Sequence, residues 1–112
     1  MRHAHPRNLQ IYRTPNGRRP FAKWLESIQD LRTQDRIDRR LERLANGNFG
    51  DCRSIGGGVS ELRIHFGPGY RIYFGELDDT IVLLLCGGDK ASQDRDIRRA
   101  KTYWLQYKET HQ

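Results

Sequence analysis

The residues best suited to chemistry lie between positions 61 and 73, in two short segments joined by Gly67-Pro68-Gly69. Five polar side chains there alternate with apolar ones: Glu61, Arg63, His65, Arg71 and Tyr73. Arginine binds phosphate, histidine moves protons near neutral pH, and tyrosine stacks on bases. The pattern therefore suits a phosphodiester ligand. A solvated outer face of an antiparallel sheet is the alternative interpretation.

The same alternation predicts the elements that must position these side chains. Apolar residues occupy the intervening positions of both segments: Leu62, Ile64, Phe66, Tyr70, Ile72 and Phe74. A period of two indicates β-strands with one apolar and one polar face. The Gly-Pro-Gly sequence favours a tight reversal between them. We expect a hairpin whose apolar face packs on a core and whose polar face carries the chemistry.

A further acid and base follow the most apolar stretch of the chain. Thr80–Cys86 (TIVLLLC) lacks alternation and is too short for a buried helix, so it is predicted to be a central strand covered on both faces. Gly87-Gly88-Asp89-Lys90 comes directly after it, where a rigid strand is expected to meet a loop. Lys90 is therefore a candidate functional residue, and a lysine that simply pairs with Asp89 is the alternative.

Three helices are predicted around this sheet. The first begins at Pro20 and carries apolar residues at helical spacing from Phe21 to Ile28. The second spans about Thr33–Ala45, and its arginines at 36, 39, 40 and 43 alternate with acids, which favours a solvated face over a nucleic-acid-binding one. The third follows Ser92 as N-cap and runs to about Tyr107, with its aromatic residues in the core or at a partner.

Together these elements predict an α+β fold in one domain of residues 1–112. A short strand is expected at Leu9–Arg13 and another near Arg53–Ile55, and residues 1–8 are expected to form a loose lead-in. The predicted order is β-α-α-β-β-β-α. The predicted sheet is antiparallel, and the two N-terminal helices pack on one of its faces. A C-terminal helix completes the predicted fold.

Composition points to a polyanionic partner. The chain of 112 residues has 20 Lys and Arg against 14 Asp and Glu, and its pI is near 9.7. Such a charge attracts nucleic acid or an acidic protein segment. Cys52 and Cys86 form no CxxC or Cys/His ligand pattern, so we expect no metal and no cofactor, and unpaired thiols fit a reducing cytoplasm. No apolar run approaches transmembrane length, so no membrane is expected.

Four segments in a fixed order give the chain a family resemblance. They are GNFGD (47–51), GVSELR (58–63), GPGYRIYF (67–74) and LCGGDK (85–90). With this order of elements, the chain resembles the RelE/ParE toxin superfamily from about Ile11 to Leu105. The resemblance is greatest to its branch of addiction module killer proteins, akin to HigB.

The resemblance implies the toxin of a type II toxin–antitoxin system, neutralised by a cognate antitoxin that we expect to be a small helix-turn-helix protein. RelE-like and HigB-like members cut mRNA on the ribosome, and a toxin–antitoxin complex on operator DNA is a further implied partner. ParE-like members instead inhibit DNA gyrase. The fold alone does not choose between an enzyme and an inhibitor, and an inactive antitoxin-binding homologue is a third possibility.

The resemblance also assigns roles to particular residues. Arg71 matches the arginine that binds the scissile phosphate in RelE-like toxins, Lys90 a later basic residue, and Arg63 a basic position on the first hairpin strand. The family's lysine pair before this motif is replaced here by Ser60-Glu61. The tyrosine or histidines that the family carries near its C-terminal end have no counterpart in the segment ASQDRDI that follows Lys90.

The expected reaction is metal-free RNA cleavage, in which the 2′-OH attacks the adjacent phosphorus and leaves a 2′,3′-cyclic phosphate. Arg71 and Arg63 would stabilise charge, Lys90 would supply either charge or a proton, and either His65 or Glu61 would be the acid or base. Three further residues are expected to contact RNA: Tyr73, Arg53 and Arg95. Arg71→Ala is expected to nearly abolish cleavage.

Overall fold

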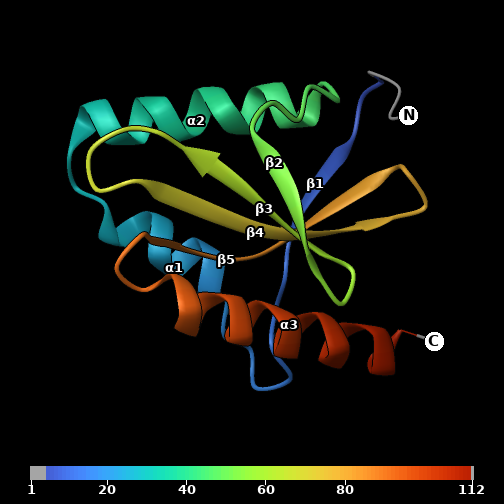
Figure 1. The fold of residues 1–112 in the computed structure, drawn as a ribbon. Helices are drawn as coiled ribbons and strands as arrows, with labels where there is room; N and C mark the ends of the chain where they lie inside the picture. The colour runs from blue at the N-terminus through green and yellow to red at the C-terminus, as the bar shows by residue number, and fades with distance from the viewer. Residues whose placement is uncertain (1–4, 112) are drawn as a thin grey trace.

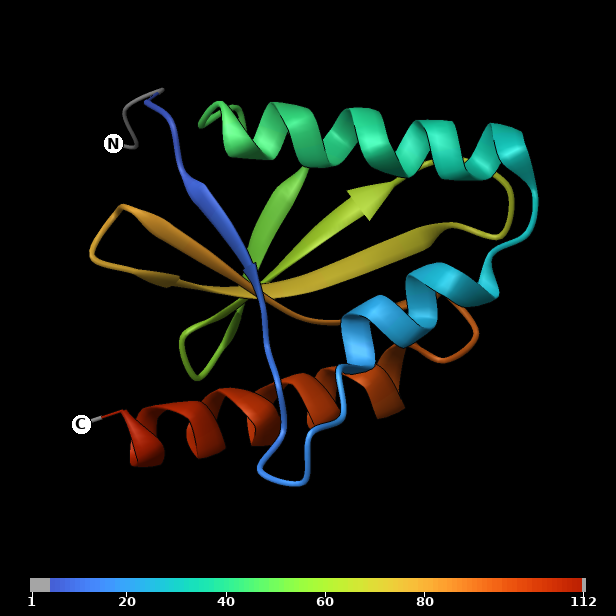
Figure 2. The same cartoon turned by 180° about the vertical axis from the view of Figure 1, so that it is seen from behind.

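The computed structural model describes residues 5–111 as three helices and a single five-stranded sheet of order β1-β5-β4-β3-β2 (Figures 1 and 2). The α+β class is as predicted. The elements in chain order are β1 (Asn8–Ile11), α1 (Pro20–Ser27), α2 (Leu31–Ala45), β2 (Cys52–Gly56), β3 (Val59–Ile64), β4 (Tyr70–Leu77), β5 (Ile81–Asp89) and α3 (Gln93–Thr110).

The sheet is mixed, so the prediction of an antiparallel sheet is wrong. Four strands follow the two N-terminal helices, where the predicted order had three. Each strand from β2 to β5 pairs antiparallel with the next strand along the chain. β1 instead pairs in parallel with β5, with Leu9 opposite Val82. Each short turn reverses the chain, so neighbouring strands alternate in direction. β1 reaches β5 only after both N-terminal helices and three strands, and such a long connection permits a parallel pair.

Each face of the sheet has its own hydrophobic core. α1 and α2 supply Phe21, Ile37 and Leu44 to one core, where they meet apolar residues of β3, β4 and β5. α3 supplies Ala100 and Trp104 to the other. Figures 1 and 2 show α2 and α3 on opposite sides of the sheet. The placement of both N-terminal helices on one face is confirmed, and α3 covers part of the face that was expected to be polar.

Several boundaries differ from the predicted ones. β3 ends at Ile64, so residues 65–69 form a loop and His65 lies just beyond the strand. β5 continues to Asp89, because Tyr70 and Arg71 of β4 still pair with it. The expected loose lead-in falls partly on residues 1–4, which lie outside the described residues. The expectation of a loose lead-in is wrong for Arg7. Its side chain is buried, and its backbone N–H donates a hydrogen bond to the Ala45 carbonyl.

Gly75 provides a test of the packing between α3 and the sheet. A methyl group at this position would lie 2.3 Å from the Trp104 ring, which is buried. Gly75→Ala is therefore expected to lower the free energy of unfolding by about 1–3 kcal/mol, as overpacking does. Urea denaturation measures it. In a Trp104→Leu background the same change should cost less, because the smaller side chain vacates the space.

Candidate functional site

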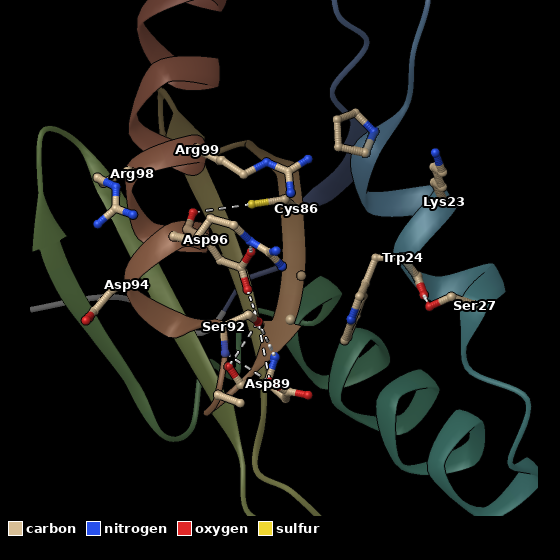
Figure 3. A pocket seen from close by; sticks show the side chains of 15 residues that line it. Lys23, Trp24, Ser27, Cys86, Asp89, Ser92, Asp94, Asp96, Arg98 and Arg99 are labelled. Carbon is tan, nitrogen blue, oxygen red and sulfur yellow. Dashed lines mark hydrogen bonds and ion pairs between the residues drawn. The ribbon is translucent and has the colours of Figure 1, made fainter.

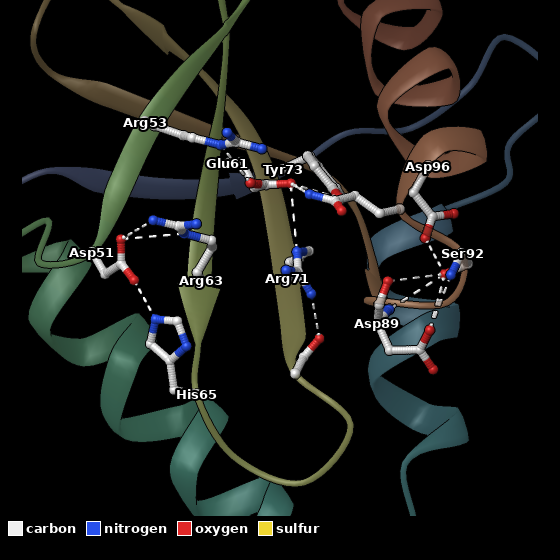
Figure 4. A network of polar contacts seen from close by, with 12 residues as sticks. Asp51, Arg53, Glu61, Arg63, His65, Arg71, Tyr73, Asp89, Ser92 and Asp96 are labelled. Atoms are coloured by element: carbon white, nitrogen blue, oxygen red, sulfur yellow. Dashed lines mark hydrogen bonds and ion pairs between the residues drawn. The ribbon is translucent and has the colours of Figure 1, made fainter.

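Two of the predicted cations, Arg63 and Arg71, lie at the end of the sheet nearest the loop between β3 and β4 (Figure 4). Arg63 of β3 lies directly opposite Arg71 of β4, so both side chains project from one face. Lys90 follows β5 and reaches the same end. A methyl group at Gly69 would lie 3.3 Å from Arg71 Nη1 and 3.8 Å from Lys90 Cβ. The structure thus brings together the three cations that the sequence singled out.

Asp51 joins two of the candidate residues into one cluster. Its Oδ1 accepts hydrogen bonds from Arg63 Nη2 at 3.0 Å and Arg63 Nε at 3.3 Å, and its Oδ2 accepts one from His65 Nε2. The backbone N–H of Arg63 also donates to the Asp51 carbonyl at 2.9 Å. The hydrogen bond from His65 above all, and those from Arg63, hold the pKa of the Asp51 carboxyl below its usual range against partial burial.

This arrangement gives His65 a defined chemical orientation. An imidazole that donates its Nε2–H to a carboxylate leaves Nδ1 with a lone pair, which accepts a proton. The side chain of His65 is 72% exposed. In Figure 4 the Asp51 carboxylate lies between Arg63 and His65. The cluster can therefore take up a proton from a ligand while a guanidinium stands beside it.

Glu61, which the sequence offered as a possible base, lies in a buried hydrogen-bond network. Its side chain has no exposed surface, and it accepts hydrogen bonds from Arg53 Nε at 2.9 Å, Tyr73 Oη at 3.0 Å and Gln93 Nε2 at 2.9 Å. Burial alone raises the pKa of Glu61, but these hydrogen bonds outweigh it and hold the pKa below the usual range. A buried carboxylate with satisfied oxygens cannot reach a ligand, so Glu61 is a structural residue and not a base.

Arg71 is held by the same network. Its Nη1 donates to the Gly69 carbonyl at 2.8 Å, and its Nε lies 3.7 Å from Glu61 Oε2 without a hydrogen bond. Only 11% of the Arg71 side chain is exposed, against 35% for Arg63. Arg63 is therefore the more accessible of the two arginines.

The three expected RNA contacts do not form one surface. Tyr73 is fully buried under α3, its hydroxyl donates to Glu61, and burial raises its pKa, so its ring belongs to the core and cannot stack on a base. Arg53 is half exposed, with its Nε bound to Glu61. Arg95 lies on α3, with its Nε 3.5 Å from Asp96.

Arg95 lines a separate cleft of about 940 Å³ between α1, the end of β5 and the first half of α3 (Figure 3). Acidic and basic side chains are mixed there. Asp96 is buried and accepts a hydrogen bond from Ser92, and Asp89 also bonds to Ser92. Burial raises the pKa of the Cys86 thiol to about 12, so it is protonated at neutral pH. These internal pairings make the cleft a weaker candidate than the His65 cluster.

Two residues of these networks were missed at the sequence level. Asp51 could have been found by extending the β2–β3 pairing, because Cys52 lies opposite Leu62 and the next pair places Asp51 beside Arg63. Gln93 had no such signal, since its contact with Glu61 depends on how α3 docks. No group of three His, Cys, Asp or Glu within residues 5–111 could hold a metal ion, and no helix in that range is long and apolar enough to cross a bilayer.

Comparison with known proteins adds one relative. The chain is 48% identical over 81 residues to a protein of Haemophilus influenzae described as uncharacterized, and the match spans 72% of this chain and 82% of the relative. The chain belongs to the same family as this protein. No family model matches the chain. Because the relative's description names no activity, the function has to be argued from the site itself.

Proposed function

We propose that this chain is the toxin of a type II toxin–antitoxin system and acts as a metal-free mRNA endoribonuclease. The observation that carries the proposal is the exposed His65, oriented by Asp51 beside Arg63, at the sheet end that Arg71 and Lys90 share. An oriented imidazole among cations has the components that transfer of an RNA phosphodiester to its own 2′-OH requires. The sequence resemblance to RelE/ParE toxins supports it as well.

In the proposed reaction, Nδ1 of His65 takes the proton of the RNA 2′-OH, and the 2′-oxygen forms a bond to the adjacent phosphorus. Arg63 and Arg71 stabilise the negative charge that develops on the phosphoryl oxygens. The bond from phosphorus to the 5′-oxygen breaks, and Lys90 supplies a proton to that oxygen. The products are a 2′,3′-cyclic phosphate and a 5′-OH. Side chains of this protein fill all three roles.

The proposal includes partners and a compartment. A cognate antitoxin, expected to be a small helix-turn-helix protein, would neutralise the toxin in the cytoplasm, and the pair would bind operator DNA. The substrate would be mRNA on the ribosome. The net charge of +6 supports association with acidic partners of either kind, since complementary charge accelerates encounter.

Inducible expression with genome-wide mapping of RNA 5′ ends tests this function. Wild type is expected to arrest growth and create new 5′-OH ends. Arg71→Ala and Arg63→Ala should each reduce cleavage by about 10²-fold or more, because each removes a transition-state cation. Arg13→Ala removes an equal charge from an exposed position and should have no effect. Circular dichroism of the purified variants confirms folding.

Other outcomes would contradict the proposal in recognisable ways. Growth arrest without new RNA ends, together with inhibition of DNA supercoiling by gyrase, would identify a ParE-like gyrase inhibitor. Absence of growth arrest, with retained binding to the product of the neighbouring gene, would identify an inactive antitoxin-binding homologue.

A further inference from the structure

A second basic feature begins at the His65 cluster and continues along α2. It is a groove of about 800 Å³ between α2 and the C-terminal end of β3. The groove is lined by Arg32, Asp35, Arg36, Arg39, Arg40, Arg43, Asp51, Arg63, Ile64 and His65. We call it the arginine groove. It shares Asp51, Arg63 and His65 with the candidate site, so the two features form one continuous surface.

Charge in the arginine groove is strongly unbalanced. Six arginines face two carboxylates, and both carboxylates are already paired: Asp35 with Arg39 at 3.0 Å, and Asp51 with the His65 cluster. Arg32, Arg36 and Arg43 are exposed, and no carboxylate among residues 5–111 lies within ion-pair distance of them. The remaining acids of α2, Asp38 and Glu42, are outside the lining. The sequence favoured a solvated helix whose charges are mixed. In the structure the arginines of α2 gather on the groove side, and two of its three acids lie outside the groove.

The arginines are regularly placed. Positions 32, 36, 39 and 43 recur every three or four residues, so they form a single stripe about 16 Å long on one face of α2. Arg36 is held with its guanidinium 4.7 Å from the centre of the Phe66 ring, which orients it without neutralising it. Arg40 instead donates to backbone carbonyls of Phe49, Asp51 and Arg63, and so fixes α2 against the sheet edge.

The lining indicates which part of a nucleic acid would bind. Apart from His65 at its mouth, it contains no aromatic residue, whereas sites for single strands present several aromatic rings on which bases stack. A row of guanidiniums at regular spacing instead matches phosphates held at fixed spacing by a double helix. The groove opens at His65, whose proposed chemistry needs a 2′-OH, which distinguishes RNA from DNA.

We propose that the arginine groove binds the phosphate backbone of double-helical RNA, and that this docking places an adjacent single-stranded segment at His65. This inference deepens the proposed function and rests on it for the choice of RNA. Arg32, Arg36 and Arg43 provide the phosphate contacts, and recognition is independent of base sequence because phosphates are the same at every base pair. Specificity would come from the presence of a duplex beside the cleaved strand.

Fluorescence anisotropy of the purified full chain tests the proposal. The probes are an RNA duplex of about 16 base pairs and its single strand. Wild type is expected to bind the RNA duplex about tenfold or more tightly than the single strand. The triple variant Arg32→Gln/Arg36→Gln/Arg43→Gln should weaken duplex binding about tenfold or more. The slope of log affinity against log salt should become shallower by about 2 to 3, one unit for each lost phosphate contact.

A matched variant controls for net charge. Arg13→Gln/Arg18→Gln/Arg19→Gln removes the same charge from exposed positions near the connection between β1 and α1, which Figure 2 shows on the side of the molecule away from α2. It should bind the RNA duplex like wild type. The proposal fails if both triple variants lose equal affinity, if the groove variant loses none, or if single-stranded RNA binds as well as duplex RNA.

The test separates failure of the groove from failure of the ribonuclease proposal. His65→Ala, which leaves the arginines of α2 in place, is expected to retain duplex binding while losing cleavage. If wild type binds the RNA duplex as expected and yet cleaves no RNA, the proposed reaction is wrong and the groove stands. If wild type cleaves RNA and the groove variant keeps its affinity for the duplex, the groove proposal is wrong and the proposed reaction stands.

Discussion

Replacing His65 by alanine is expected to reduce RNA cleavage by about 10² to 10⁴-fold, the usual contribution of a general base. Proton transfer from the 2′-OH has no substitute within this cluster, because Asp51 is engaged by His65 and Arg63, and Glu61 is buried. The side chain of His65 is 72% exposed and lies in a loop, so its removal should leave the fold intact. Single-turnover cleavage of ribosome-bound mRNA measures the loss.

Two companion variants sharpen this result. Asp51→Asn retains a polar partner but no longer requires the Nε2–H tautomer, so it should lower cleavage by less than His65→Ala does and leave RNA binding unchanged. His111→Ala removes an exposed histidine near the end of α3 and should cleave at the wild-type rate. Cleavage by His65→Ala within a few fold of wild type would exclude His65 as the base.

Replacing Glu61 by alanine is expected to lower the free energy of unfolding by about 3–5 kcal/mol, the usual cost of removing one partner of a buried ion pair. The change leaves the Tyr73 hydroxyl, which α3 covers, without its acceptor, and it leaves Arg71 without its nearby charge. Gln93, in the first turn of α3, loses its bond to the sheet. Chemical denaturation measures the effect.

Glu61→Gln is the matched control, because the amide keeps the shape and one acceptor oxygen but not the charge. It should cost less than alanine does. Its activity should remain close to that of wild type in the folded protein, since a buried carboxylate does not reach the RNA. A large loss of cleavage by Glu61→Gln at unchanged stability would return Glu61 to the list of catalytic candidates.

The same carboxylate predicts how stability responds to acid. The folded-state pKa of Glu61 is lowered, so its contribution is fully present above the pKa of an unfolded-state glutamate and is lost as the pH falls through the lowered value. Wild type should therefore lose more stability between pH 7 and about pH 3 than Glu61→Gln does. Denaturation midpoints of both proteins at the two pH values check this. Equal losses would show that Glu61 retains an ordinary pKa in the folded state.

The sequence by itself determined most of the secondary structure and the pairing of the hairpin. Alternation at period two placed Leu62, Ile64 and Ile72 on one face and Arg63 and Arg71 on the other, as the structure has them. Pro20 begins α1, and the apolar run before Asp89 is an interior strand covered on both faces, although β4 and not this strand lies at the centre of the sheet. These are local properties, because backbone geometry and turn residues decide them within a few residues of chain.

Only the tertiary structure decided which part of the polar face can act. α3 docks over Tyr73 and Glu61 and leaves Arg63 and His65 open, although all four share the same alternation. Docking also placed the arginine stripe of α2 beside His65. Periodicity reports which face a residue occupies. What covers that face depends on contacts between segments far apart in the chain, here Glu61 with Gln93, and no local pattern encodes such contacts.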